Sequence, residues 1–243
     1  MGNNQTKIIN GEYKEYYTNG NIHKNYNYIK GKLHGSYITY YQNGNIHEYY
    51  HYKNGVLNGE CKEYYDNGQI NNYKIYSKNK CVCKSFYRNG NTYRECTYIN
   101  NRLDDEYKEY YDNGQLRLHY YYSRERYHGE YKEYYDNGQL YISCNYLNGM
   151  YHGKYVQYYS PDKIYIECNY NNGLLDGYYT KYHLNGNIQI RCKCDNGYIR
   201  GEFTEYYDNE TIKIFSNCAN VKLPTCYENQ HSYIKINVEE ENI

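Results

Sequence analysis

Apolar and aromatic residues recur along the chain in short runs that alternate with polar residues, which predicts β-strands. Tyrosine and isoleucine flank an Asn-Gly pair in GEYKEYYTNGNI from Gly11, and the same arrangement returns in GSYITYYQNGNI from Gly35. An Asn-Gly pair between two such runs is the strongest short-range signal of a β-hairpin, because both residues tolerate a positive φ. Glycine at such regular intervals would also break a helix. Each phrase is therefore expected to fold as a hairpin with Asn and Gly at positive φ.

The phrase is an internal repeat that covers most of the chain. It returns every 24 residues, except that the copy CVCKSFYRNGNT begins at Cys81, 22 residues after its predecessor. A second turn, near Gly31 in the first copy, returns the chain to the next repeat. We expect nine repeats, at residues 11–34, 35–58, 59–80, 81–104, 105–128, 129–152, 153–176, 177–200 and 201–224. Residues 1–10 are expected to form an N-terminal leader, and residues 225–243 a C-terminal capping strand followed by an acidic tail.

Stacking the repeats in register places like residues in columns. Three columns are aromatic or aliphatic in nearly every copy, and their first members are Tyr16, Ile22 and Tyr28. One hairpin cannot bury such a face alone, whereas neighbours stacked in register can. We therefore expect an all-β fold, in which about nine 24-residue β-hairpin repeats stack into an elongated, single-layer antiparallel sheet.

The repeated phrase resembles a known family. Tyr-x-Asn-Gly-x-Ile/Leu followed by Tyr-x-x-Gly-x-Leu-x-Gly is similar to the MORN repeat (membrane occupation and recognition nexus), in the variant form of bacterial and large-DNA-virus proteins. The resemblance covers residues 11 to about 224. The chain departs from the standard repeat because it has no tryptophan, and because Cys81, Asn101, Asp105 and Glu125 replace the usual glycine.

The resemblance implies a β-hairpin solenoid that serves as a scaffold, a dimerisation module or a membrane-proximal adaptor, and it does not imply catalysis by the repeats. Stacked aromatic hairpins also resemble choline-binding and glucan-binding cell-wall repeats. Those repeats depend on tryptophan-lined cages for ligand cations, and tryptophan is missing here.

Composition removes several classes of function. The mean hydropathy of -1.15 suggests disorder, but tyrosine alone occurs 44 times, and disordered chains are poor in aromatic residues. A formal net charge of zero without a basic block argues against nucleic-acid binding. There is no apolar run long enough for a membrane-spanning helix and no secretory signal in residues 1–10. Most of the ten cysteines are then expected to be free thiols in a reducing, cytoplasmic location.

Four of the cysteines share one phase of the repeat: Cys96, Cys144, Cys168 and Cys192. Equivalent residues of successive hairpins lie two strands apart, about 9.5 Å, which is too far for a disulfide. Because tyrosine fills this column in other copies, we interpret these cysteines as small buried apolar residues. The pairs Cys81-x-Cys83 and Cys192-x-Cys194 could bind zinc only by sharing a site, and they are too many repeats apart to do so.

Charged residues also repeat in columns. The acidic column comprises Glu15, Glu63, Glu109, Glu133 and Glu205, and the basic column Lys14, Lys62, Lys108 and Lys132. We interpret the two columns as one solvated sheet face. No nucleophile elbow, Walker loop or zinc-protease motif is present. We therefore expect no catalytic, cofactor-binding or metal site, and no cofactor.

The extreme N-terminus carries a separate signal. Met1 to Thr6 match the N-myristoylation pattern, with Gly2 as the acceptor. Our leading interpretation is a non-catalytic repeat scaffold that mediates protein–protein interaction with an unidentified protein partner, or with a second copy as a homodimer. The alternative is a peripheral membrane adaptor, N-myristoylated and lipid-associated, that binds a membrane surface. Nucleic acid is not an expected partner.

Overall fold

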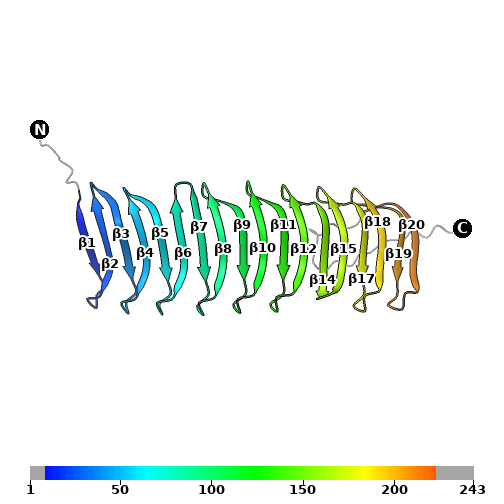
Figure 1. The fold of residues 1–243 in the computed structure, drawn as a ribbon, viewed down its shortest axis with the longest axis horizontal. Coiled ribbons are helices and arrows are strands. Elements are labelled where there is room, and N and C mark those ends of the chain that lie inside the picture. Colours follow the sequence, from blue (N-terminus) through cyan, green and yellow to red (C-terminus); the bar gives the residue numbers. More distant parts are fainter. Residues whose placement is uncertain (1–8, 223–243) are drawn as a thin grey trace, which may run out of the picture. The chain divides into compact units, whose positions relative to one another are not determined.

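The computed structural model describes residues 9–222, which form twenty β-strands and no helix (Figure 1). By its internal contacts the chain divides between Leu116 and Arg117 into two compact units. The predictions for the leader's first residues, including Gly2, and for the cap and tail at residues 225–243 lie outside the described residues.

Consecutive strands pair antiparallel within each unit, so the all-β hairpin prediction is confirmed. The strands of the first unit are β1 (Gly11–Tyr16), β2 (Ile22–Ile29), β3 (Lys32–Tyr40), β4 (Ile46–Lys53), β5 (Val56–Tyr64), β6 (Ile70–Ser77), β7 (Lys80–Phe86), β8 (Thr92–Ile99) and β9 (Arg102–Tyr110). Those that follow are β10 (Leu116–Ser123), β11 (Arg126–Tyr134), β12 (Leu140–Leu147), β13 (Met150–Tyr151), β14 (Gly153–Ser160), β15 (Lys163–Asn171), β16 (Leu174–Leu175), β17 (Gly177–Tyr182), β18 (Ile188–Asp195), β19 (Tyr198–Tyr206) and β20 (Ile212–Lys222).

The Asn-Gly turn differs from the prediction. In the turn between β1 and β2, Gly20 has a φ of 87°, but Asn19 is not at positive φ. The Gly20 N–H donates to the Tyr17 carbonyl at 3.0 Å, and the Asn19 side-chain oxygen accepts from the Asn21 N–H at 3.1 Å. Asparagine is therefore used here for its side chain, which caps the turn, and only the glycine is used for its backbone freedom.

The turns in which both central residues have positive φ lie at the opposite end of the hairpins. Asn54 and Gly55 have φ values of 54° and 83°, and they separate the paired residues Lys53 and Val56. This is the two-residue type I′ geometry that matches the twist of the strands. A turn with two residues at positive φ was predicted correctly, but it is the turn that joins one repeat to the next and not the turn within the repeated phrase.

A bulge between successive hairpins explains the remaining glycine, and its loss explains the short copy. Tyr26 pairs with Tyr37 and Tyr28 with Leu33, so β3 has extra residues there, and Gly35 takes a φ of 85° within them. In the copy that begins at Cys81, β6 pairs with β7 without any register shift. The two missing residues therefore removed the bulge and left the hairpin intact.

Side-chain hydrogen bonds join successive repeats within each unit near the Asn-Gly turn. The Tyr17 hydroxyl donates to the Tyr40 carbonyl at 2.6 Å, one repeat later. Equivalent bonds run from Tyr41 to Tyr64, Tyr65 to Phe86, Tyr87 to Tyr110, Tyr135 to Tyr158 and Tyr159 to Tyr182, and from the His183 ring to Tyr206. Asparagine amides reinforce the same junctions, as when Asn45 donates to the Asp66 carbonyl at 2.8 Å.

The three predicted columns do not share one face. Tyr28 lies on the same side as Tyr13 and Tyr26, whose rings it contacts. Tyr16 lies three residues after Tyr13 on β1, and an odd spacing within a strand places two side chains on opposite faces. Ile22 pairs with Tyr16. The prediction was wrong because the register shifts between Glu15 and Tyr16, and the extra residue in β2 turns Ile22 to the other side.

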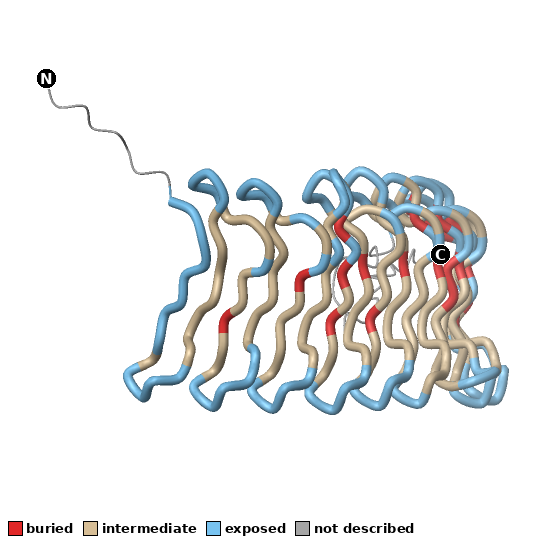
Figure 2. Tube along the Cα trace, turned by 60° about the vertical axis from the view of Figure 1, so that its left-hand side comes forward, coloured by how far each residue is buried: buried red, intermediate tan, exposed pale blue. Residues whose placement is uncertain are grey.

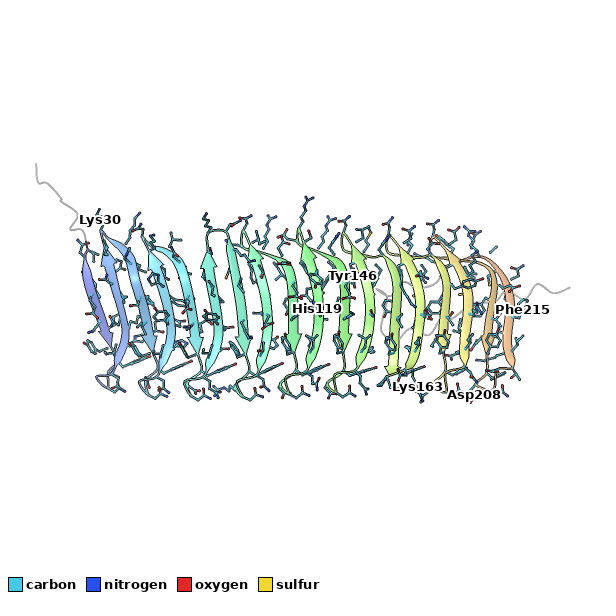
Figure 3. The ribbon with its side chains drawn as sticks, in the orientation of Figure 1. Lys30, His119, Tyr146, Lys163, Asp208 and Phe215 are labelled. Carbon is cyan, nitrogen blue, oxygen red and sulfur yellow. The ribbon has the colours of Figure 1, made fainter. Side chains whose placement is uncertain are left out.

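Figure 2 marks the buried residues along the trace, and most of them lie in the second unit. In the second unit the largest cluster includes Tyr146 of β12, labelled in Figure 3, and Ile199, which is fully buried. Cysteines and aromatic rings alternate across its strands, as in the pairs Tyr131–Cys144, Tyr155–Cys168 and Tyr179–Cys192. The small thiols let the large rings interdigitate, so a single sheet buries part of its own surface.

Candidate binding surface

A row of tyrosine rings crosses the beginning of the first unit. Tyr13, Tyr26, Tyr37 and Tyr50 are successive cross-strand partners on β1 to β4. The Tyr13 and Tyr26 rings stack at 5.9 Å between centroids, and the Tyr26 and Tyr37 rings at 5.5 Å. The Tyr37 and Tyr50 rings lie 6.4 Å apart. Such separations are those of favourable aromatic pairs, so each ring helps to fix its neighbours.

A second row lies beside the first. The Tyr28 ring meets Tyr13 and Tyr26 edge-on at 5.7 and 5.8 Å, and the Tyr52 ring meets Tyr37 at 6.1 Å. Glycine stands opposite each of these rings, Gly11 across from Tyr28 and Gly35 across from Tyr52. The absent side chain leaves room for the ring. We call Tyr13, Tyr26, Tyr28, Tyr37, Tyr50 and Tyr52 the tyrosine face of the first unit.

The tyrosine face is accessible. Tyr13 is 39% exposed and the other five rings are half-buried. All the strands described for residues 9–116 belong to the sheet itself, so within that range no second layer packs on this face. In the second unit the equivalent surface is more closed, because Tyr146, Tyr155 and Tyr170 are at most 8% exposed. These three tyrosines are therefore less accessible than their equivalents in the first repeats.

Acidic residues accept hydrogen bonds from these tyrosines. Glu15 accepts from the Tyr26 hydroxyl at 2.9 Å and pairs with Lys24 at 3.0 Å. Hydrogen bonds from Lys24 and Tyr26 lower the pKa of Glu15. Glu63 accepts from the Tyr50 hydroxyl at 3.3 Å, and burial together with the nearby Glu63 raises the pKa of Tyr50. The hydroxyls of Tyr26 and Tyr50 are thus oriented by the carboxylates, which also raise the pKa of both.

The prediction of one solvated charged face is wrong in part. Lys14, Lys62 and Lys108 lie on the opposite side from the tyrosine face, where they pair with Glu12, Glu60 and Glu106, and Lys132 of the second unit pairs with Glu130. The acidic column follows the lysines by one residue and therefore points to the other face. Glu109 of this column is only 8% exposed and accepts from the Tyr107 hydroxyl at 3.0 Å. The two columns were predicted to share one face because they are adjacent in the sequence.

The described residues offer no group of three or more His, Cys, Asp or Glu side chains arranged to hold a metal ion. Residues 9–222 also contain no helix long and apolar enough to cross a membrane. Nine cysteines are described, and all of them are buried. The stacked tyrosine rings are the feature of the described residues from which a binding surface can be argued.

The model of one protein family matches the repeats of the chain. The model described as "MORN repeat variant" matches residues 9–30, 33–54, 57–79, 82–100, 106–123 and 127–148, which together make up more than half of the chain. The chain belongs to the MORN repeat variant family. The matched repeats include all four strands that carry the tyrosine face, and the same phrase continues beyond residue 148.

No curated protein matches the chain. Two solved structures show a distant likeness. The one described as "Crystal Structure of TcdB2-TccC3-Cdc42" shares 10% identity with a TM-score of 0.20, over 85% of this chain and 15% of that one. The one described as "Crystal Structure of TcdB2-TccC3" shares 10% identity with a TM-score of 0.17, over 86% of this chain and 18% of that one. The MORN chain thus spans less than a fifth of either.

Proposed function

We propose that this MORN-repeat chain is a non-catalytic scaffold that binds another protein through the tyrosine face of its first unit. The observation that supports this function is the stack of rings from Tyr13 to Tyr50, which is accessible on an open sheet. Tyrosine is enriched at protein interfaces, because it offers a large apolar ring and a polar tip with few rotatable bonds. Rings that are already stacked lose less side-chain entropy on binding.

The geometry of the repeats favours an extended partner. Equivalent tyrosines on successive hairpins lie two strands apart, about 9.6 Å, so Tyr13 and Tyr37 present like groups at a regular interval. A partner segment that crosses the strands would meet a ring at each step and a carboxylate, such as Glu15 or Glu63, beside it. Aromatic anchors rimmed by polar groups are typical of specific interfaces.

Affinity purification from host cells with matched variants tests this function. The double variant Tyr26→Ser/Tyr37→Ser removes the centre of the ring stack, while Tyr49→Ser changes a tyrosine on the opposite face of β4. We expect a protein that is retained by the wild type and by Tyr49→Ser, and lost with the double variant, with unchanged β-sheet circular dichroism. Equal recovery with all three forms would refute the tyrosine face as the binding surface.

The alternative function is a peripheral membrane adaptor, and it depends on the N-myristoylation pattern at Gly2, outside the described residues. One myristoyl chain binds membranes only marginally, so the tyrosine face would have to add the second contact. Flotation of the myristoylated chain with anionic vesicles tests it. Binding that is lost in both Gly2→Ala and Tyr26→Ser/Tyr37→Ser would support the adaptor, and failure of the intact chain to float would exclude it.

A further inference from the structure

Three thiols meet on β7 and β8, in the copy of the repeat that lacks the bulge. Cys83 and Cys96 are direct cross-strand partners. Cys81 lies two residues before Cys83 on the same strand, and their sulfur atoms are 3.4 Å apart. All three side chains are buried, with exposed fractions of 8% for Cys81, 6% for Cys83 and 4% for Cys96. Together they form the centre of a separate apolar cluster.

The facing pair is distinctive among the described strands. The other cysteines of the two units have a residue of another type across from them, such as Lys74 opposite Cys61 and Tyr155 opposite Cys168. Only Cys83 and Cys96 are opposed to each other among the strand pairs between residues 9 and 222. A comparison of equivalent positions in successive repeats cannot detect this pair, because its members occupy two different positions of one hairpin.

Backbone geometry favours one disulfide over the other. Direct partners in an antiparallel pair have Cα atoms about 4.5–5.5 Å apart, which is the separation that a disulfide bridges. Residues two apart on an extended strand are separated by about 6.6 Å, near the upper limit for a bridge. The Cys83–Cys96 pair can therefore close without displacement of the backbone, whereas the Cys81–Cys83 pair would be strained.

Two cations adjoin the thiols. Lys74 is the partner of Cys83 on the β6 side, and Arg94 precedes Cys96 by two residues on the same face. A hydrogen bond with Cys83, followed by the charge of Arg94, lowers the pKa of Cys96, and the same hydrogen bond raises the pKa of Cys83. Because the thiolate is the reactive form, we assign the attacking role to Cys96, which adjoins Arg94, and the resolving role to Cys83.

We propose that Cys83 and Cys96 form an oxidation site that closes to a disulfide in the presence of hydrogen peroxide. The Cys96 thiolate attacks one peroxide oxygen and breaks the O–O bond, which gives a sulfenic acid and releases hydroxide. The sulfur of Cys83, which loses its proton as it reacts, then attacks the sulfenic sulfur and expels its hydroxyl group, so that the S–S bond forms. Overall the two thiols give up two protons and two electrons, and one peroxide becomes two waters.

Peptide mapping of the wild-type chain tests the site without any mutation. The folded chain is treated with dilute peroxide, the remaining thiols are alkylated in denaturant, and the digest is analysed without reduction. We expect a linked pair of peptides that contain Cys83 and Cys96, at least about tenfold more abundant than any other cysteine pair, because their Cα atoms already lie within bridging range. A link between Cys81 and Cys83, no link at all, or a random mixture would overturn the proposal.

Variants then separate the roles of the three thiols. Cys81→Ser and the distant control Cys168→Ser should still form the Cys83–Cys96 link, while Cys96→Ser should leave Cys83 unlinked. Peroxide treatment in strong denaturant should abolish the preference, since the register that opposes the two residues is lost. If the unfolded chain gave the same preference as the folded one, the fold would not be its cause and the proposal would fail. The readout does not depend on a binding partner, so failure of the proposed scaffold function would leave this result unaffected.

Discussion

The hydroxyl of Tyr41 provides a direct test of how the repeats are joined. It donates to the Tyr64 carbonyl of the next repeat at 2.7 Å, and burial raises the pKa of the Tyr41 hydroxyl. Tyr41→Phe removes one oxygen atom and leaves the ring, so packing is nearly unchanged. The carbonyl of Tyr64 then loses a donor at a junction that is partly shielded from water.

The expected cost follows from the bond that is lost. A hydrogen bond of this kind contributes about 0.5–1.5 kcal/mol net to the free energy of unfolding. Tyr17 and Tyr65 make the same bond at the neighbouring junctions, at 2.6 and 2.8 Å. The three sites are about one repeat apart and share no partner, so their costs should add, and the triple Phe variant should lose about 1.5–4.5 kcal/mol.

Equilibrium unfolding in urea, followed by circular dichroism, measures these costs. Tyr49→Phe is the matched control, because the Tyr49 hydroxyl has no hydrogen-bond partner among the described residues. We expect the control to change the free energy of unfolding by less than about 0.5 kcal/mol. If Tyr41→Phe behaved like the control, or if the triple variant cost no more than the single one, the hydroxyl bonds would not be what couples one repeat to the next.

Three further predictions concern the turns, the tyrosines and the last junction. Asp105 has a φ of 74° where most repeats have glycine, so Asp105→Gly should raise the free energy of unfolding by about 0.5–1 kcal/mol while Asp105→Ala should not; a gain with both would contradict the backbone explanation. Burial and Glu95 raise the pKa of Tyr110 to about 12. Because the folded state favours the neutral phenol, the contribution of Tyr110 to stability is complete below the ordinary pKa of 10.0 and is lost as the pH rises toward 12. The urea midpoint of the wild type should therefore fall across this pH range, and that of Tyr110→Phe should fall less. A parallel fall in both proteins would contradict the prediction. The His183 ring lies 3.0 Å from the Tyr206 carbonyl in place of the usual tyrosine, so His183→Phe should lower the melting temperature and His183→Tyr should restore it; equal melting temperatures would exclude a role for this bond.

The repeat made the hairpins predictable, since a phrase that recurs at a fixed interval marks both strands and both turns. The distribution of side chains between the two faces was not predictable, because a single extra residue in β2 reverses Ile22 relative to Tyr28. That residue leaves no mark in the spacing of the phrase, which is the same in a bulged and an unbulged strand.

The tyrosine face was recognisable only in part. The column that begins with Tyr28 was predicted from the sequence, but the column that contains Tyr13 and Tyr37 was not. These two rings stack on either side of Tyr26. The third residue of the phrase is tyrosine in most copies, and that was the available signal. Which copies leave their rings accessible depends on packing with cysteine, as in the Tyr155–Cys168 pair, and packing of this kind has no local sequence signature.

The bonds between repeats have a direction. At the described junctions within each unit the earlier hairpin supplies a side-chain donor and the later one a main-chain carbonyl, as from Tyr41 to Tyr64. The donor is a tyrosine hydroxyl except at the junction where the His183 ring replaces it. Any residue type can supply that carbonyl, so a duplicated segment of 24 residues carries both the donor for the next repeat and the acceptor for the previous one. Gene segments of this length could be gained or lost during evolution without compensating substitutions elsewhere, whereas an insertion of half that length would leave its donor facing the wrong strand.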